Sequence, residues 1–347
     1  MKLEVRDLTK SFEGNQVLHG ISFEVESGSA LGLLGRNGAG KTTTIRIIMD
    51  VFKADEGEVY LDDEPFNPKK HLIGYLPEER GLYPKKTVLE QIVYLTRLRG
   101  LSKKEAVNNA KKWLKRLEID EYANRKLETL SKGNQQKVQL ASTLACEPEI
   151  VILDEPFSGL DPVNSKILQD VVTEVINEGR IVIFSSHQMS YVEEFCRDIA
   201  IIDKGNIALA GNLKDIKRQY GENQLVISDV NMGLDELSQI IKDNVSDIIT
   251  ETGRTREIIV RNINGVSRAD ILKRMIACGI EIEHFETYKP SLNDIFVSLV
   301  GDDMEDDKVV DYKNNSNDDN SYNRDIVDEL PQGESSEHKK SVEGGVR

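Results

Sequence analysis

The chain has 347 residues, of which 39% are hydrophobic and 30% charged, values that are ordinary for globular domains. Its length suits a large domain plus a smaller one, and its formal net charge of −15 argues against nucleic acid as the main ligand. Cys146, Cys196 and Cys278 form no CxxC pair, so neither a disulfide framework nor a zinc site is predicted, and a reducing cytoplasm is expected.

Membrane spans are not expected in this sequence. No apolar run approaches the roughly 18 residues that a spanning helix requires. The first residues, MKLEVRDLTK, lack the apolar region of a signal peptide. We therefore expect any membrane association to come through a partner protein.

The first predicted unit is a strand, a glycine-rich loop and a helix. Leu31 to Leu34 form a short apolar run, and the loop GRNGAGKT follows from Gly35 to Thr42. The apolar face of the helix that follows is predicted to contain Ile45, Ile48, Met49 and Phe52. Residues 1 to about 218 continue to alternate strand-like and helical runs, which predicts an α/β architecture with a central sheet.

The glycine-rich loop matches GxxxxGK[ST] at Gly35, Gly40, Lys41 and Thr42. Glycines allow backbone amides to wrap a phosphate, and a helix that begins near Lys41 directs its positive end at the anion. Lys41 would neutralise the β and γ phosphates of a nucleotide, and Thr42 would offer its hydroxyl to Mg²⁺. A glycine-rich turn without a ligand is the alternative, which the flanking strand and helix disfavour.

Another helix is predicted from Ser102, which forms a possible capping box with Glu105. The apolar positions that follow at helical spacing are Val107, Ala110, Trp113, Leu114 and Leu117. The opposite face carries Lys111, Lys112, Lys115 and Arg116. A basic stripe could bind nucleic acid or a membrane surface, but acidic residues lie nearby, so we expect a solvated face with Trp113 in the core.

The run IVILDEP, from Ile150 to Pro156, predicts a buried strand that ends in two carboxylates. Asp154 suits the outer coordination of Mg²⁺, and Glu155 would polarise an attacking water. A strand that merely meets an acidic loop is the alternative. The phosphate-binding loop in the same chain favours the functional interpretation.

Further elements are predicted after this strand. Asp161 and Pro162 suit the N-cap and first residue of a helix that stops near Gly179. A strand over Ile181 to Ser185 follows. Next comes a predicted hairpin, whose strands are Ile199 to Ile202 and Ile207 to Ala210.

Residues 222 to 300 predict a separate small α+β domain. Its expected strands are Gln224 to Ile227, Glu257 to Val260 and Glu281 to Phe285, and its expected helices are Leu234 to Ile241 and Arg268 to Cys278. The tail, residues 301–347, has 14 acidic and six basic residues and few large apolar groups, so we expect it to be disordered. It carries about half of the net charge.

Across residues 1 to about 218 the chain resembles the ATPase subunits of ABC transporters. Phe12 matches the aromatic that stacks on adenine, LSKGNQQ from Leu130 to Gln136 resembles the LSGGQ signature, and SGLD from Ser158 to Asp161 matches the D-loop. His187, after two serines, matches the switch histidine that contacts the γ-phosphate. The resemblance implies an ABC-type P-loop cassette with a helical subdomain at about residues 85–145.

The resemblance also implies the site residues. Those expected to bind ATP are Phe12, Gly35, Asn37, Gly38, Gly40, Lys41, Thr42, Thr43, Glu78, Ser131, Gly133 and Asp161. Those expected at Mg²⁺ are Thr42, Asp154 and Glu78, and the catalytic residues are Glu155 and His187.

Two positions depart from the common family pattern. Glu78, in YLPEERGLYP, stands where the family usually has the Gln that senses Mg²⁺ and couples to the membrane subunit. Lys132 and Asn134 replace Gly and Gln in the signature, while Ser131 and Gly133 remain at the positions that would reach the γ-phosphate. Both departures, and a C-terminal segment ending in PSLNDIFVSLVG, resemble the branch of sodium and drug efflux ATPases.

The implied protein is an ATPase that drives a separate membrane permease from the cytoplasmic face of the membrane, in the direction of export. ATP would close a head-to-tail dimer, formed with a second copy or a similar cassette, between the phosphate loop of one subunit and the signature of the other. A ribosome-associated or DNA-repair ATPase is the alternative, but such proteins usually carry two cassettes or a long coiled coil. A switch without turnover is disfavoured by Glu155 and His187. The sequence does not indicate the transported substrate.

Overall fold

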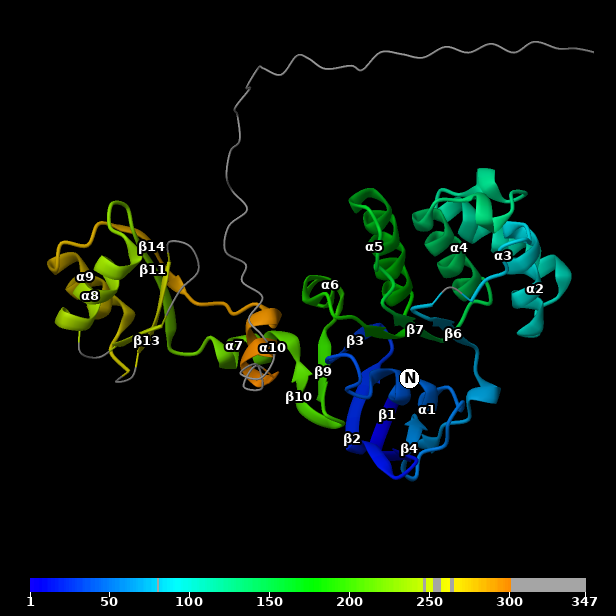
Figure 1. Ribbon diagram of the computed structural model, residues 1–347, viewed down its shortest axis with the longest axis horizontal. Helices are drawn as coiled ribbons and strands as arrows, with labels where there is room; N and C mark the ends of the chain where they lie inside the picture. The colour runs from blue at the N-terminus through cyan, green and yellow to red at the C-terminus, as the bar shows by residue number, and fades with distance from the viewer. Residues whose placement is uncertain (80, 246–247, 252–256, 263–264, 301–347) are drawn as a thin grey trace, which may run out of the picture. The chain divides into compact units, whose positions relative to one another are not determined.

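The computed structural model describes residues 1–79, 81–245, 248–251, 257–262 and 265–300 (Figure 1). The acidic segment 301–347, for which we predict disorder, lies outside the described residues.

A largely parallel sheet forms the centre of the N-terminal part, with the strand order β10-β9-β3-β8-β7-β6. Its strands are β3 (Ser29–Leu34), β6 (Ile73–Leu76), β7 (Ile150–Asp154), β8 (Ile181–Ser185), β9 (Asp198–Asp203) and β10 (Asn206–Asn212). Only β10 runs antiparallel to its neighbour. Every residue of β3, β7 and β8 is buried, as expected for parallel strands that are covered on both faces.

One face of this sheet packs against α1 and a second, antiparallel sheet of order β2-β1-β4-β5. The elements of this layer are β1 (Lys2–Phe12), β2 (Asn15–Glu26), α1 (Lys41–Ile48), β4 (Glu56–Leu61) and β5 (Glu64–Pro65). Alternate apolar side chains of β1 and β2 point into the shared core, which is the pattern of strands buried on one face.

The other face of the central sheet is covered by helices, and Figure 1 shows them on the side opposite α1. They are α2 (Val88–Leu98), α3 (Lys103–Arg116), α4 (Lys132–Leu144), α5 (Pro162–Asn177) and α6 (Met189–Phe195). Short 3₁₀ turns occupy Pro68–Lys70, Asp120–Tyr122 and Leu127–Thr129. The central sheet is thus the middle layer of three, and its strand ends remain free to carry a site.

Helix α3 forms as predicted. Ser102 caps it, with a reciprocal capping box to Glu105, and Trp113 is fully buried. On the basic face, the Lys112 ammonium lies 3.0 Å from the Glu147 carboxylate and the Arg116 guanidinium 2.5 Å from Glu174. These ion pairs agree with the expectation of a solvated face on a core helix.

A third sheet, of order β12-β13-β11-β14, follows α7 (Leu213–Tyr220) and has a hydrophobic core of its own. Its elements are β11 (Gln224–Asp229), α8 (Leu234–Asn244), β12 (Ile248–Glu251), β13 (Ile258–Asn262), α9 (Arg268–Ala277) and β14 (Ile282–Thr287). The chain then forms α10 (Leu292–Val300). The predicted strands and helices of this region are confirmed, whereas β12 and α10 were not predicted.

The prediction for the end of α1 was wrong. Phe52 lies beyond the helix, which stops at Ile48, because Asp50 adopts a left-handed backbone with φ of 59°. The Phe52 ring instead packs edge-on against Phe12, with the ring centroids 5.3 Å apart.

Candidate functional site

Four neighbouring parallel strands end at the same edge of the central sheet. β3 leads into the glycine-rich loop, β6 into Glu78, β7 into Asp154 and Glu155, and β8 into His187. Because β3, β8, β7 and β6 are adjacent and parallel, these chemical groups converge in space. The carboxyl ends of parallel strands are where α/β proteins bind ligands.

The glycine-rich loop has room only for glycine at its two defining positions. A Cβ on Gly35 would lie 2.3 Å from the Ile202 carbonyl oxygen, and one on Gly40 would lie 2.6 Å from the Leu18 side chain. Both have positive φ, 153° and 115° respectively. The loop therefore keeps a tight curve that ends at the N-terminus of α1, whose free amides favour an anion.

The Lys41 side chain lies along the inside of the loop and is buried. Its ammonium donates to the carbonyl oxygens of Gly35 (2.7 Å) and Arg36 (3.2 Å). Burial lowers the pKa of this ammonium, and the charges of Glu155 and Asp154 oppose that shift. A poorly hydrated cation beside the free amides of a helix N-terminus is well placed to bind an anionic ligand.

Asp154 and Glu78 bring carboxylates toward the same place. Asp154 is only 4% exposed, and burial raises its pKa, with the charges of Glu78 and Glu155 acting in the same direction. Within the described residues no group of three or more His, Cys, Asp and Glu side chains could hold a metal. The predicted magnesium set, the Thr42 hydroxyl with these two carboxylates, is all oxygen and lines one cavity, so it fits a Mg²⁺ bound together with phosphates.

Glu155 and His187, predicted separately, lie in direct contact. The Glu155 Oε1 atom lies 2.7 Å from the His187 Nδ1 atom and accepts the His187 backbone N–H at 2.7 Å. Its Oε2 atom accepts the Ser186 hydroxyl at 3.1 Å. The Glu155 backbone is left-handed, with φ of 50°, a conformation that a non-glycine residue rarely adopts and that often occurs at functional sites. The carboxylate is thus held in one orientation.

A cavity of about 670 Å³ joins most of the predicted residues. Those that line it are Gly35, Asn37, Gly38, Gly40, Lys41, Thr42, Thr43, Glu78, Asp154, Glu155 and His187. Phe12 does not line it. Its ring is 37% exposed at the end of β1, beside the turn into β2, and Val17 of β2 does line the cavity. Adenine stacking by Phe12 stays a prediction.

The remaining predicted residues form a second group, away from the lining of this cavity. Ser131 caps α4, and its hydroxyl accepts the Asn134 backbone N–H at 3.3 Å. Asp161 caps α5, accepting the Asn164 backbone N–H at 2.9 Å. Gly133 of α4 lies against α5, since a Cβ at this position would be only 2.7 Å from the Asn164 side chain. Two helix N-termini therefore lie side by side, as an anion-binding surface would require.

Several residues at the cavity were not predicted. Ser186 orients Glu155 by donating its hydroxyl to the carboxylate. Its position directly before His187 is the feature of the sequence that could have indicated it. Arg36, Val17 and Met189 line the cavity as neighbours of predicted residues. Phe296 lines it from α10, and no local pattern could have indicated that.

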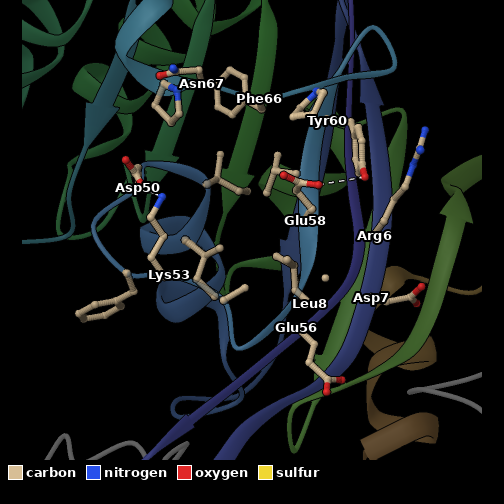
Figure 2. A pocket seen from close by; sticks show the side chains of 18 of the residues that line it. Arg6, Asp7, Leu8, Asp50, Lys53, Glu56, Glu58, Tyr60, Phe66 and Asn67 are labelled. Atoms are coloured by element: carbon tan, nitrogen blue, oxygen red, sulfur yellow. Dashed lines mark hydrogen bonds and ion pairs between the residues drawn. The ribbon is translucent and has the colours of Figure 1, made fainter.

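A larger cavity, of about 1060 Å³, lies elsewhere, between β1, β4 and the end of α1 (Figure 2). Several of its charged side chains are already paired. Arg6 pairs with Glu4 and Asp63, the Lys53 ammonium lies 2.5 Å from Asp50, and the Tyr60 hydroxyl donates to Glu58 at 3.0 Å. This cavity contains no part of the glycine-rich loop and none of the strand-end carboxylates, so we do not assign the chemistry to it.

Family comparisons agree with this geometry. Residues 18–158 match a family model described as "ABC transporter", and residues 211–300 match "ATP-binding protein DrrA1-3-like, C-terminal domain". The chain is 40% identical over 300 residues to an uncharacterized ABC transporter ATP-binding protein, YhaQ, of Bacillus subtilis, covering 86% of this chain and 98% of that protein. It is 28% identical to the linearmycin resistance ATP-binding protein LnrL of the same organism, over 88% of this chain and all of that protein.

Solved structures also resemble this chain over about two thirds of its length. An ATP-binding subunit of an ABC transporter superposes with a TM-score of 0.59 at 30% identity, covering 68% of this chain and 97% of that one. A dimeric ATP-binding cassette in a post-hydrolysis state, bound to ADP and Pi, superposes with a TM-score of 0.55 at 25% identity, over 61% and 98% of the chains. None of the helices in the described part of the chain combines the length and the hydropathy that a membrane span requires.

Proposed function

The chain belongs to the ATP-binding subunits of ABC transporters, a family of ATPases, and from this premise we propose that two cassettes close on ATP to drive a separate membrane permease. The closing partner is a second copy of this chain or a similar cassette. The permease holds the protein at the cytoplasmic face of the membrane.

This proposal rests on one observation: the predicted nucleotide-binding residues fall into two separate groups within one chain. The phosphate loop and the acids that follow β6 and β7 line one cavity, whereas Ser131, Gly133 and Asp161 gather on the N-termini of α4 and α5. Each set is chemically suited to phosphate and neither is complete. A head-to-tail dimer would bring the signature of one cassette over the phosphate loop of the other, at an isologous interface. The dimeric relative bound to ADP and Pi supports this arrangement.

The chemistry follows from the contacts of the cavity residues. Lys41 and the loop amides hold the phosphates, and Glu155 accepts a proton from the water that attacks the γ-phosphate. His187, whose side chain is 62% exposed, is free to turn from Glu155 toward the phosphate. Bound Mg²⁺, held by Thr42, Asp154 and Glu78, would neutralise charge that develops on the phosphate oxygens.

An exposed apolar surface on α2 and the segment before it supports docking of a permease. Tyr83, Tyr94 and Leu98 are 50%, 52% and 66% exposed, and we call them the α2 surface. They line two hollows, one of which also includes Pro77, the residue before Glu78. Gln139 of α4 holds the backbone at this point, because its side-chain amide donates to the Pro77 carbonyl oxygen at 3.0 Å. A movement of the permease against the α2 surface would thus reach Glu78 and the signature helix together.

Two observations support export as the direction of transport. The resemblance to efflux ATPases in YLPEERGLYP points to export, and LnrL, the relative named for linearmycin resistance, is in line with it. The transported substrate is left to the permease.

The experiment is purification of the tagged full-length chain from detergent-solubilised membranes. We expect a protein with several membrane spans to co-purify, and Leu98→Glu and Tyr94→Glu to release it while ATP binding is retained. Ile276→Glu, which alters an equally exposed apolar residue of α9, is the matched control and should keep the partner. Recovery of ribosomal proteins, with no membrane protein, would instead support a non-transport ATPase.

A further inference from the structure

The last described helix, α10, reaches back to the phosphate loop from far along the chain. It begins at Leu292, whose backbone N–H donates to the Glu193 carboxylate of α6. It ends at Val300, whose carbonyl oxygen accepts the Arg36 guanidinium at 2.7 Å. Arg36 is the second residue of the GRNGAGKT loop. α10 therefore joins α6, which follows His187, to the loop that would hold the phosphates.

The packing of α10 shows which of its faces lies against the cassette. Leu292 and Ile295 are buried in the same core as α5 and α6, and Phe296 and Leu299 pack against that core. Asn293, Val297 and Ser298 are exposed. This is the apolar stripe of an amphipathic helix, and with Val300 it covers more than two turns.

Both ends of α10 are fixed by polar interactions. At its start, Ser291 and Asp294 cap the helix, since the Ser291 hydroxyl accepts the Asp294 N–H at 3.1 Å and donates to the Asp294 carboxylate at 2.7 Å. At its end, the Val300 carbonyl has no partner within the helix, and the Arg36 guanidinium is a favourable one for the negative pole. Docking is therefore specific and not merely apolar.

Phe296 stands between these two attachments and lines the same cavity as Lys41, Asp154, Glu155 and His187. Because α10 contacts α6, whose first residue Met189 also lines the cavity, Phe296 enters from the end that holds His187. The cavity keeps about 670 Å³ with Phe296 in place. The ring is thus part of a wall and does not fill the space.

We infer that α10 is a wall of the nucleotide site, in which Phe296 contacts the bound nucleotide and Val300 fixes Arg36 of the phosphate loop. This rests on the proposed function of that cavity. Nucleotide binding and α10 docking then favour each other, and the coupling is reciprocal. The small sheet becomes part of the coupling, because the chain passes directly from its last strand, β14, to α10. The beginning and the end of this sheet region are also joined, since the Tyr288 N–H after β14 donates to the carbonyl oxygen of Gln224 at the start of β11 at 3.0 Å.

The test measures ATP binding to the full chain in a Glu155→Gln background, together with hydrogen exchange of residues 292–300. Phe296→Ala should raise the dissociation constant for ATP about 3- to 10-fold, the range of one aromatic contact, and Phe296→Leu should recover part of it. Val297→Ala, on the exposed face of the same helix, is the matched control and should change nothing. ATP should slow exchange in α10 of the parent, and less so in Phe296→Ala.

The results separate this inference from the proposed function. ATP binding that depends on Lys41 but is the same in Phe296→Ala and the parent, or exchange in α10 that ATP leaves unaltered, would overturn the role of α10 alone. Failure of the parent to bind ATP would overturn the nucleotide site itself. A dissociation constant raised equally by Val297→Ala would also contradict the inference, because that side chain lies outside the cavity.

Discussion

At the scale of single residues, the contact between Glu155 and His187 is the most informative feature. Sequence indicated both residues but not their contact, which arises because β7 and β8 are adjacent and end together. Ser186 and the His187 backbone N–H hold the carboxylate against the cavity, while the left-handed backbone of Glu155 turns it away from the strand. A carboxylate oriented in this way is suited to act as a general base.

Glu155→Gln should therefore bind ATP as the parent does and lose turnover by roughly 10²- to 10⁴-fold, the usual contribution of a general base. Phosphate release and equilibrium ATP binding measure the two properties. Glu149→Gln makes the same change just before the start of β7, on an exposed side chain that pairs with His71, and should hydrolyse ATP normally. Hydrolysis by Glu155→Gln at the parental rate would remove Glu155 from this role.

The residues that could be predicted are those that belong to short local sequence motifs. The glycines of the phosphate loop, Lys41 and the strand-end acids follow from spacing, and Ser131 and Asp161 from resemblance. Phe296 could not be predicted, because its place at the cavity depends on how α10 packs against the cassette. That packing involves residues far apart in sequence, such as Arg36 and Val300, which are 264 positions apart. Phe12 was predicted from resemblance, and its ring packs against Phe52 and does not line the cavity.

At the scale of elements, periodicity predicted the strands of the central sheet well, because strands covered on both faces are continuous apolar runs. Where it was wrong, a single residue was responsible. The left-handed Asp50 ends α1 before Phe52, although the apolar spacing continues. β12 is too short to give a clear periodic signal, whereas α10 has an apolar stripe at helical spacing that was not assigned to a helix; both elements pack into hydrophobic cores.

The capping box of α3 offers a test at this scale. Ser102→Ala removes the hydroxyl that accepts the Glu105 backbone N–H, and should lower the free energy of unfolding by about 1 kcal/mol. Denaturant titration measures the loss. Because α3 lines no part of the nucleotide cavity, ATP hydrolysis per folded molecule should equal that of the parent. A change in turnover with unaltered stability would mean that α3 has a function that its packing does not indicate.

At the scale of the whole molecule, the proposed ATP site needs two cassettes. One chain presents a phosphate loop with its acids and, separately, a signature with its neighbouring D-loop residue. The N-termini of α4 and α5 gain a ligand only when a phosphate is brought to them, so ATP would supply the free energy of association. A permease docked on the α2 surface, as we propose, would sense that closure through Gln139 and Glu78.

Sedimentation of Glu155→Gln with and without ATP tests this claim most directly. We predict a monomer without nucleotide, a dimer with ATP, and a monomer again when Ser131→Arg is added, since an arginine at the signature would obstruct the partner's phosphate loop while ATP still binds to Lys41. An ATP-bound protein that stays monomeric would contradict pairing between two copies of this chain, and a dimer that forms equally well with Ser131→Arg would contradict the shared site.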